Sequence, residues 1–118
     1  VLRKSWSSST AYKSCQSEWV SEDPSYGQCA ITATLVYDMF GGSIHRIRVE
    51  GGGTHYFNKI TGQYVDLTRE QFDLYNIEVA YEPNETMQRE YCCKNSDTNA
   101  RYRQLQRNII AYLKNNED

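Results

Sequence analysis

The stretch from Cys29 to Phe40 constrains the fold more than any other part of the sequence. Its apolar residues recur at the spacing of one helix face, and they are Ile31, Leu35, Val36, Met39 and Phe40. The pair Gly41-Gly42 follows at once, and glycine readily takes the left-handed conformation that ends many helices. The sequence therefore predicts a central helix over residues 29–40 with a buried apolar face.

Alternating apolar and polar residues predict a small antiparallel sheet beside this helix. Residues 54–60 and 63–68 flank the dipeptide Thr61-Gly62, which is typical of a β-hairpin turn. Residues 44–49 are expected to form a strand before the hairpin, and residues 77–81 a strand after it. The glycines at residues 51–53 predict a flexible joint between the first two strands.

Helices are expected before and after the sheet. The first lies within residues 2–19 and is anchored in the core by Trp6 and Trp19. The others are a helical turn at residues 69–73, a helix over about residues 85–94, and a last helix that begins after an Asp97 or Thr98 cap. At 118 residues the chain suffices for one core, so we expect a single α+β domain over residues 1–118.

Charge and composition argue against several classes of protein. The formal net charge is -2 and no basic stripe occurs, so nucleic acid is not an expected partner. No apolar run approaches the roughly 20 residues of a membrane span, and no signal-peptide core is found. Ten tyrosines against three phenylalanines predict many half-buried rings along grooves and sheet faces.

The cysteines show neither a metal-binding nor a disulfide-scaffold pattern. They are Cys15, Cys29, Cys92 and Cys93, with no C-x-x-C among them, and His45 and His55 are not at a helical ligand spacing. We therefore expect no metal, no cofactor and a reducing, cytoplasmic location. The sequon Asn84-Glu85-Thr86 matters only if the protein is secreted by a eukaryote.

Cys29 is the strongest candidate for a nucleophile, because it opens the central helix after a turn. The first backbone N–H groups of a helix are unpaired, and the helix dipole there favours negative charge. A cysteine at this position is favoured as the nucleophilic thiolate, and the same N–H groups can hold an oxyanion. One residue thus combines activation with stabilisation of the transition state.

The hairpin register predicts that His55 and Asp66 are neighbours. If the turn has two residues, Ile60 faces Gln63 and His55 faces Thr68. Side chains two apart share a strand face, which makes His55 and Asp66 diagonal neighbours roughly 7–8 Å apart at the backbone. Asp66 would then fix the tautomer and orientation of the imidazole. A slip of one residue would put the two side chains on opposite faces.

Each of these residues also has a simpler interpretation. Cys29 could be a small buried apolar residue, His55 an exposed strand histidine, and Asp66 a helix cap before Arg69. The order of cysteine, histidine and aspartate along the chain favours the catalytic interpretation. The competing base, His45, lies in a charged stretch and is expected at the surface.

Three further residues are candidates for oxyanion or substrate binding. Gln28 carries an amide next to the nucleophile, although a role in stabilising the turn is equally consistent with its position. Asn58 is the weaker orienter, because it should point to the opposite strand face from His55. Gly53 could let a substrate backbone pass close to His55 or could simply belong to a loop.

Several segments resemble the YunG-like family of small, poorly characterised bacterial proteins. The resemblance runs from about Trp6 into the C-terminal part of the chain, and it implies no established activity. The segments that carry it are Gly27-Gln28-Cys29-Ala30-Ile31-Thr32-Ala33, Phe40-Gly41-Gly42, His55-Tyr56-Phe57-Asn58, Val65-Asp66-Leu67-Thr68 and Gln71-Phe72.

More distantly, the arrangement resembles the core of the transglutaminase and papain-like cysteine hydrolases. The shared pattern is a cysteine at a helix start, a histidine on the next hairpin and an aspartate on the strand after it. This resemblance implies Cys29 as nucleophile, His55 as base and Asp66 as orienter. The papain-type oxyanion glutamine is missing, since its region holds Asp23 and Pro24 here, and so is the aromatic residue after the cysteine.

The sequence leaves three functions open. The first is a thiol hydrolase or acyltransferase that acts on an amide, ester or thioester of a small molecule, peptide or protein. The second is a catalytically inactive binding module on the same fold. The third is redox sensing through Cys29, Cys92 or Cys93, which requires an exposed reactive thiol with a resolving partner.

Overall fold

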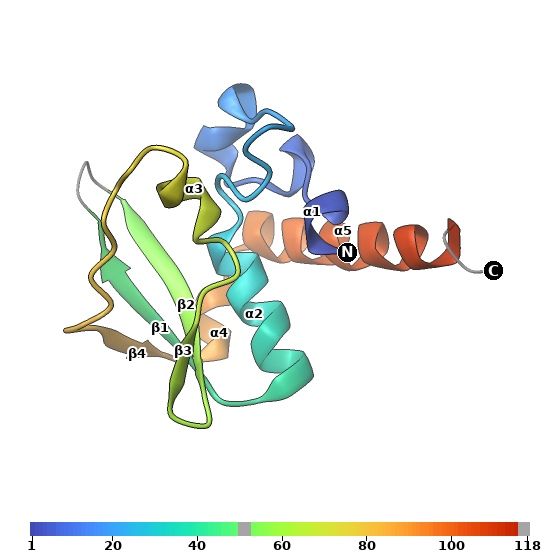
Figure 1. Ribbon diagram of the computed structural model, residues 1–118. Coiled ribbons are helices and arrows are strands. Elements are labelled where there is room, and N and C mark those ends of the chain that lie inside the picture. The colour runs from blue at the N-terminus through green and yellow to red at the C-terminus, as the bar shows by residue number, and fades with distance from the viewer. Residues whose placement is uncertain (50–52, 116–118) are drawn as a thin grey trace.

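The computed structural model describes residues 1–49 and 53–115, apart from the side chain of Cys93, and shows an α+β arrangement (Figure 1). An antiparallel four-stranded sheet has the order β3-β2-β1-β4. Its strands are β1 (Ser43–Arg48), β2 (Thr54–Ile60), β3 (Gln63–Val65) and β4 (Glu85–Met87). The helices are α1 (Leu2–Ser5), η1 (Ser8–Thr10), η2 (Lys13–Glu18), α2 (Cys29–Phe40), α3 (Glu70–Asp73), α4 (Arg89–Cys93) and α5 (Ser96–Asn115).

Helix α2 has the predicted bounds, and glycine ends it as expected. Gly41 has a φ of 77° and donates its N–H to the carbonyl of Tyr37 at 2.9 Å. Gly42 has a φ of 78°, and a Cβ at this position would lie 2.3 Å from the carbonyl oxygen of Lys59. Glycine is therefore required here both by the backbone conformation and by the close approach of β2.

Two apolar clusters cover opposite sides of α2. Ile31 and Leu35 pack with Trp6 and with Tyr102 and Leu105 of α5. The other side faces the sheet, where a second cluster contains Ala33, Ile44 and Cys92. The last turn of α2 extends beyond this cover, and the side chains of Met39 and Phe40, predicted to be buried, are exposed.

The predicted hairpin register is confirmed along β2 and β3. Ile60 pairs with Gln63, and the pairing continues to Asn58 and Val65. Thr61 and Gly62 both have positive φ, 47° and 81°, as a type I′ turn requires. The ladder ends one residue before Asp66.

The strand predicted at residues 77–81 is wrong. The chain is irregular there, and the fourth strand is β4, which pairs with residues 44–46 of β1. Of the helix predicted over residues 85–94, only α4 (Arg89–Cys93) forms, because residues 85–87 belong to β4. Pairing with the free edge of β1 outweighs the local helical pattern, because tertiary context decides strand formation in short segments.

The ends of the molecule also differ in detail from the sequence-based predictions. Trp6 is buried, but Trp19 is only half-buried and donates its indole N–H to the carbonyl of Pro24 at 3.1 Å. The segment around them forms one helical turn and two 3-10 helices. Helix α5 is capped by Asn95, whose Oδ1 accepts the N–H of Asp97 at 2.7 Å, and not by Asp97 or Thr98.

Among the helices of residues 1–49 and 53–115, none combines the length and apolar character needed to cross a membrane. Of the predicted glycine joint, only Gly53 lies within the described residues.

The cluster between α2 and α5 predicts that two substitutions on α5 lower the free energy of unfolding by different amounts. Leu105 is 0% exposed, so Leu105→Ala leaves a cavity and should lower the free energy of unfolding by about 2–5 kcal/mol. Leu113 is 53% exposed, and Leu113→Ala should cost less than about 0.5 kcal/mol. Urea denaturation followed by circular dichroism measures both values, and equal costs would contradict this description of the core.

Candidate active site

Cys29 occupies the first position of α2, at the end of the helix nearest to the start of β2. The N-cap residue is Gln28, and no side chain caps the first turn. The cysteine is half-buried, and its thiol lies 3.8 Å from the carbonyl oxygen of Thr54, to which it donates. The helix start and β2 therefore meet at the sulfur atom.

His55 lies next to Thr54 on β2, and its ring is almost fully enclosed. Its side chain is 1% exposed. The edge of the ring packs against Phe72, with 4.7 Å between centroids, and one face stacks on Phe57 at 6.1 Å. These contacts fix the plane of the imidazole, so that its two nitrogens point in defined directions.

Asp66 binds His55 and is itself held by further donors. Its Oδ2 lies 2.7 Å from Nε2 of His55 and accepts the hydroxyl of Tyr81 at 2.8 Å. Its Oδ1 accepts the backbone N–H and the hydroxyl of Thr68, each at 3.3 Å. A buried carboxylate needs such donors, and they fix the orientation of Asp66 as well. The diagonal neighbours predicted from the hairpin are therefore in contact.

The two ring nitrogens of His55 differ in their hydrogen bonding. Nε2 is engaged by Asp66, whereas Nδ1 is buried and has no hydrogen-bond partner in the described part of the chain. Burial lowers the pKa of His55, but the hydrogen bond to Asp66 and the interaction with Cys29 raise it, and the pKa reaches about 9. His55 and Asp66 are thus in contact, and Cys29 lies near enough to His55 to raise its pKa.

Gln28 is completely buried, and its amide is fully engaged. Its Oε1 accepts the hydroxyl of Thr10 at 2.7 Å, and its Nε2 donates to the carbonyls of Ser7 at 3.1 Å and Tyr26 at 3.3 Å. These contacts attach the turn before α2 to the N-terminal segment. Gln28 therefore positions Cys29, and its amide hydrogens are directed at backbone carbonyls.

Asn58 and Gly53 lie in different environments. Asn58 is 2% exposed and donates its amide to the carbonyl of Ala33 at 2.9 Å, which ties β2 to α2 on the face away from His55. Gly53 has a φ of 97° and open space where a side chain would be. The substrate role of Gly53 stays a prediction, whereas the amide of Asn58 serves to join two elements.

The prediction that His45 lies at the surface is wrong. The side chain is 7% exposed, because β4 and the residues before it cover this part of β1. Its Nε2 is 2.7 Å from the hydroxyl of Ser43, and its Nδ1 is 2.9 Å from Oδ1 of Asn84. Both nitrogens are therefore bound to groups outside the Cys29 site.

Two residues of the site were not predicted from the sequence. Tyr81 was expected on a strand, and only the path of residues 77–82 brings its hydroxyl to Asp66. Phe72 lies in one of the segments that carry the family resemblance, but no local pattern indicates that it packs on His55. Both contacts join segments distant in the sequence.

Comparisons with known proteins identify a family without a known activity. The sequence profile described as "YunG protein" matches residues 1–114. Over 72 residues the chain is 42% identical to the "Uncharacterized protein YunG" of Bacillus subtilis (strain 168), and the alignment covers 61% of this chain and 57% of that protein. The matched part thus spans just over half the length of this curated relative. No solved structure matches the chain.

The raised pKa of His55 predicts a specific dependence of stability on pH. The folded protein keeps this proton up to about pH 9, whereas the unfolded chain releases it near 6.5. The contribution to stability is therefore complete below pH 6.5 and is lost as the pH rises towards 9. Thermal unfolding should show a melting temperature that falls across this interval.

Asp66→Asn removes the carboxylate that helps to raise the pKa, so this variant should show a smaller fall in melting temperature over the same interval. The matched control is Asp73→Asn, since Asp73 is an exposed carboxylate paired with Arg69. Identical pH profiles for the wild type and Asp66→Asn would show that His55 does not hold its proton through Asp66.

Proposed function

The chain belongs to the YunG family, and from this premise we propose that it is a thiol hydrolase or acyltransferase acting on an amide, ester or thioester. The observation that carries the proposal is the buried pair of His55 and Asp66, 2.7 Å apart, in which Nδ1 of His55 makes no hydrogen bond within the described residues and Cys29 helps to raise the pKa of the ring. A nucleophile, a base and an orienting carboxylate in this order are the groups that acyl transfer requires.

The proposed reaction proceeds in two steps. The thiolate of Cys29 attacks the substrate carbonyl carbon, and a carbon–sulfur bond forms while His55 gives its proton to the leaving amine, alcohol or thiol. A water molecule or an acceptor amine then gives its proton to His55 and attacks the acyl group, which releases Cys29. Asp66 keeps Nε2 occupied in both steps, so Nδ1 exchanges the proton.

The developing oxyanion would be held by the first turn of α2. The initial N–H groups of a helix have no intrahelical partner, and no side chain caps this turn. Such fixed donors stabilise a negative charge on the carbonyl oxygen at the helix start. Gln28 contributes by holding this backbone in place, through its bonds to Thr10, Ser7 and Tyr26.

The resemblance to transglutaminase and papain-like enzymes supports the proposal at the level of arrangement. A cysteine begins the helix that packs on the sheet, and β2 carries the histidine, as that resemblance implies. In the region of the papain-type oxyanion glutamine this chain has Asp23 and Pro24, and the amide of Gln28 donates to the carbonyls of Ser7 and Tyr26. The proposal therefore relies on backbone N–H groups at that place. It also places the protein in the cytoplasm, where its thiols would stay reduced.

A second candidate function is a binding module without turnover. It is favoured by the enclosure of the His55 ring and by the fact that the residues lining the cavity beside β1 do not include Cys29. In this alternative the buried polar pair would only stabilise the hairpin. The reactivity of Cys29 separates the two functions.

The proposal predicts that Cys29 reacts rapidly with iodoacetamide at pH 6, where ordinary thiols are protonated. Labelling should be roughly ten times faster at Cys29 than at the half-buried Cys15, and His55→Asn should remove most of the difference. Mass spectrometry of the digested protein gives both rates in one sample. A Cys29 rate equal to that of Cys15 would refute the activated nucleophile.

An acyl-enzyme should form with p-nitrophenyl acetate as the probe. The acetyl group is transferred to the sulfur of Cys29, p-nitrophenolate leaves, and its release is followed by absorbance. Cys29→Ser should abolish the rapid phase, whereas Cys15→Ser should leave it unchanged. Acetylation of both cysteines at equal rates would favour the binding module.

A further inference from the structure

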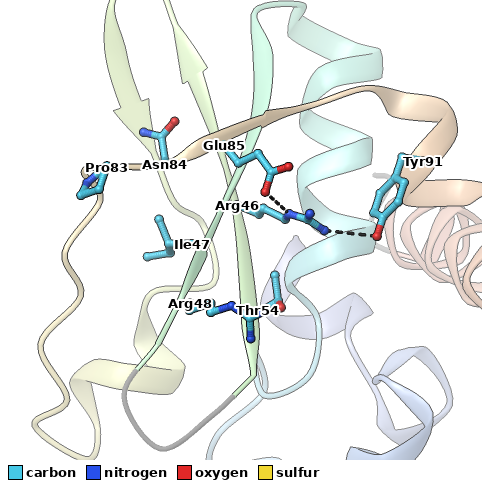
Figure 2. A pocket seen from close by; sticks show the side chains of 8 residues that line it. All are labelled: Arg46, Ile47, Arg48, Thr54, Pro83, Asn84, Glu85 and Tyr91. Atoms are coloured by element: carbon cyan, nitrogen blue, oxygen red, sulfur yellow. Dashed lines mark hydrogen bonds and ion pairs between the residues drawn. The ribbon is translucent and has the colours of Figure 1, made fainter.

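A cavity of about 530 Å³ lies beside β1, at the place where β4 begins (Figure 2). This volume is within the usual range for ligand sites. The residues that line the cavity come from β1, β2, α4 and the segment that leads into β4, and they are Arg46, Ile47, Arg48, Thr54, Pro83, Asn84, Glu85 and Tyr91. Arginine side chains dominate its charge.

The edge of β1 at the cavity has an unpaired part. β4 pairs with β1 only as far as Arg46. The N–H of Val49 bonds to the carbonyl of Gly53 at 3.3 Å, so by the alternation of an antiparallel ladder the N–H and C=O of Arg48 point away from β2. Pro83 has no N–H with which to continue β4 along Arg48.

The described residues that line the cavity include two arginines and one carboxylate. Arg46 donates to Glu85 at 2.9 Å and to the hydroxyl of Tyr91 at 3.2 Å, as Figure 2 shows. The side chain of Arg48 is exposed and makes no hydrogen bond with the part of the chain that the structure describes, but beside the hydrogen bond from Arg46 its charge helps to lower the pKa of Glu85. Among the described lining residues, two guanidinium groups thus share one carboxylate, and their net charge is positive.

The cavity is connected to the candidate active site through Thr54. Thr54 lines the cavity and pairs with Arg48 across the strands. Its carbonyl, on the other side of β2, accepts the thiol of Cys29, and the next residue is His55. β1 therefore separates a segment bound along Arg48 from β2, which carries the proposed base His55, and Cys29 of α2 contacts the far side of β2.

We propose that this cavity binds an extended acidic peptide, whose backbone pairs with the free edge of β1 and whose Asp or Glu carboxylate pairs with Arg48. In so far as this peptide is the substrate, the inference rests on the proposed function. Backbone pairing supplies affinity for any extended chain, and Arg48 supplies the preference for a carboxylate, since charge-assisted hydrogen bonds are stronger than neutral ones.

Binding is tested on the full chain with Cys29→Ala, so that no chemistry is needed. The probes are the capped peptides acetyl-Ala-Ala-Glu-Ala-Ala-amide and its Gln counterpart, titrated by NMR. The Glu peptide should bind about five times more tightly, with shifts at the amides of Arg48 and Thr54. Arg48→Gln should remove this preference, while Arg103→Gln, an exposed arginine on α5, should leave it unchanged. Equal affinities for both peptides, or shifts confined to α5, would overturn the acidic-peptide site.

A second measurement separates this inference from the proposed function. In the wild-type protein, saturating Glu peptide should slow the alkylation of Cys29 by iodoacetamide, and the slowing should disappear in Arg48→Gln. Binding without any slowing would overturn the cavity as a substrate site while leaving the reactive thiol intact. An unreactive Cys29 together with selective binding would refute the enzyme and retain the peptide site.

Discussion

The position of α2 governs the rest of the structure, because this helix is covered on two sides and carries the candidate nucleophile at its first residue. One side packs on Trp6 and α5, and the other faces β1 and β2. Two buried amides complete the attachment: Gln28 holds the backbone before the helix, and Asn58 bonds to a carbonyl in its middle. A shift of α2 would break these hydrogen bonds and leave buried polar groups unsatisfied, which is costly.

A second constraint is that the buried carboxylate of Asp66 needs hydrogen-bond donors. Its two oxygens accept four hydrogen bonds, from the ring of His55, the hydroxyl of Tyr81 and two donors of Thr68. These donors come from β2, from the segment before β4 and from the turn before α3. The carboxylate therefore joins segments that are separate in the sequence. The same hydrogen bonds that stabilise the fold here also fix the orientation of the imidazole of His55.

The candidate active site and the cavity beside β1 are two distinct features of this protein. The proposed thiol chemistry depends on Cys29, His55 and Asp66, and the name of the family to which the chain belongs states no activity. The cavity beside β1 adds a place for a partner that the arrangement itself lacks. Its charge and its unpaired strand edge favour an extended acidic chain, and Thr54 is the residue that the cavity and the Cys29 contact share.

A feature of this structure could be predicted from the sequence when it depends on residues close together in the chain. Residues 29–40 carry a helical repeat and a glycine stop, so the helix and both its ends were predictable. The two-residue turn fixed the hairpin register, and with it the approach of His55 to Asp66. In contrast, residues 77–87 have no decisive local pattern. The sequence favoured a strand and then a helix there, and pairing with the free edge of β1 produced β4 instead.

The sequence by itself thus determined the α+β class, the bounds of α2, the hairpin register and the contact between His55 and Asp66. These features depend on periodicity and on turn geometry, which act over a few residues. Only the tertiary structure decided that His45 is buried, that Tyr81 and Phe72 belong to the site, and that Gln28 and Asn58 serve the fold. The physical reason is that each of these outcomes depends on which distant segment covers the side chain and supplies its hydrogen-bond partners.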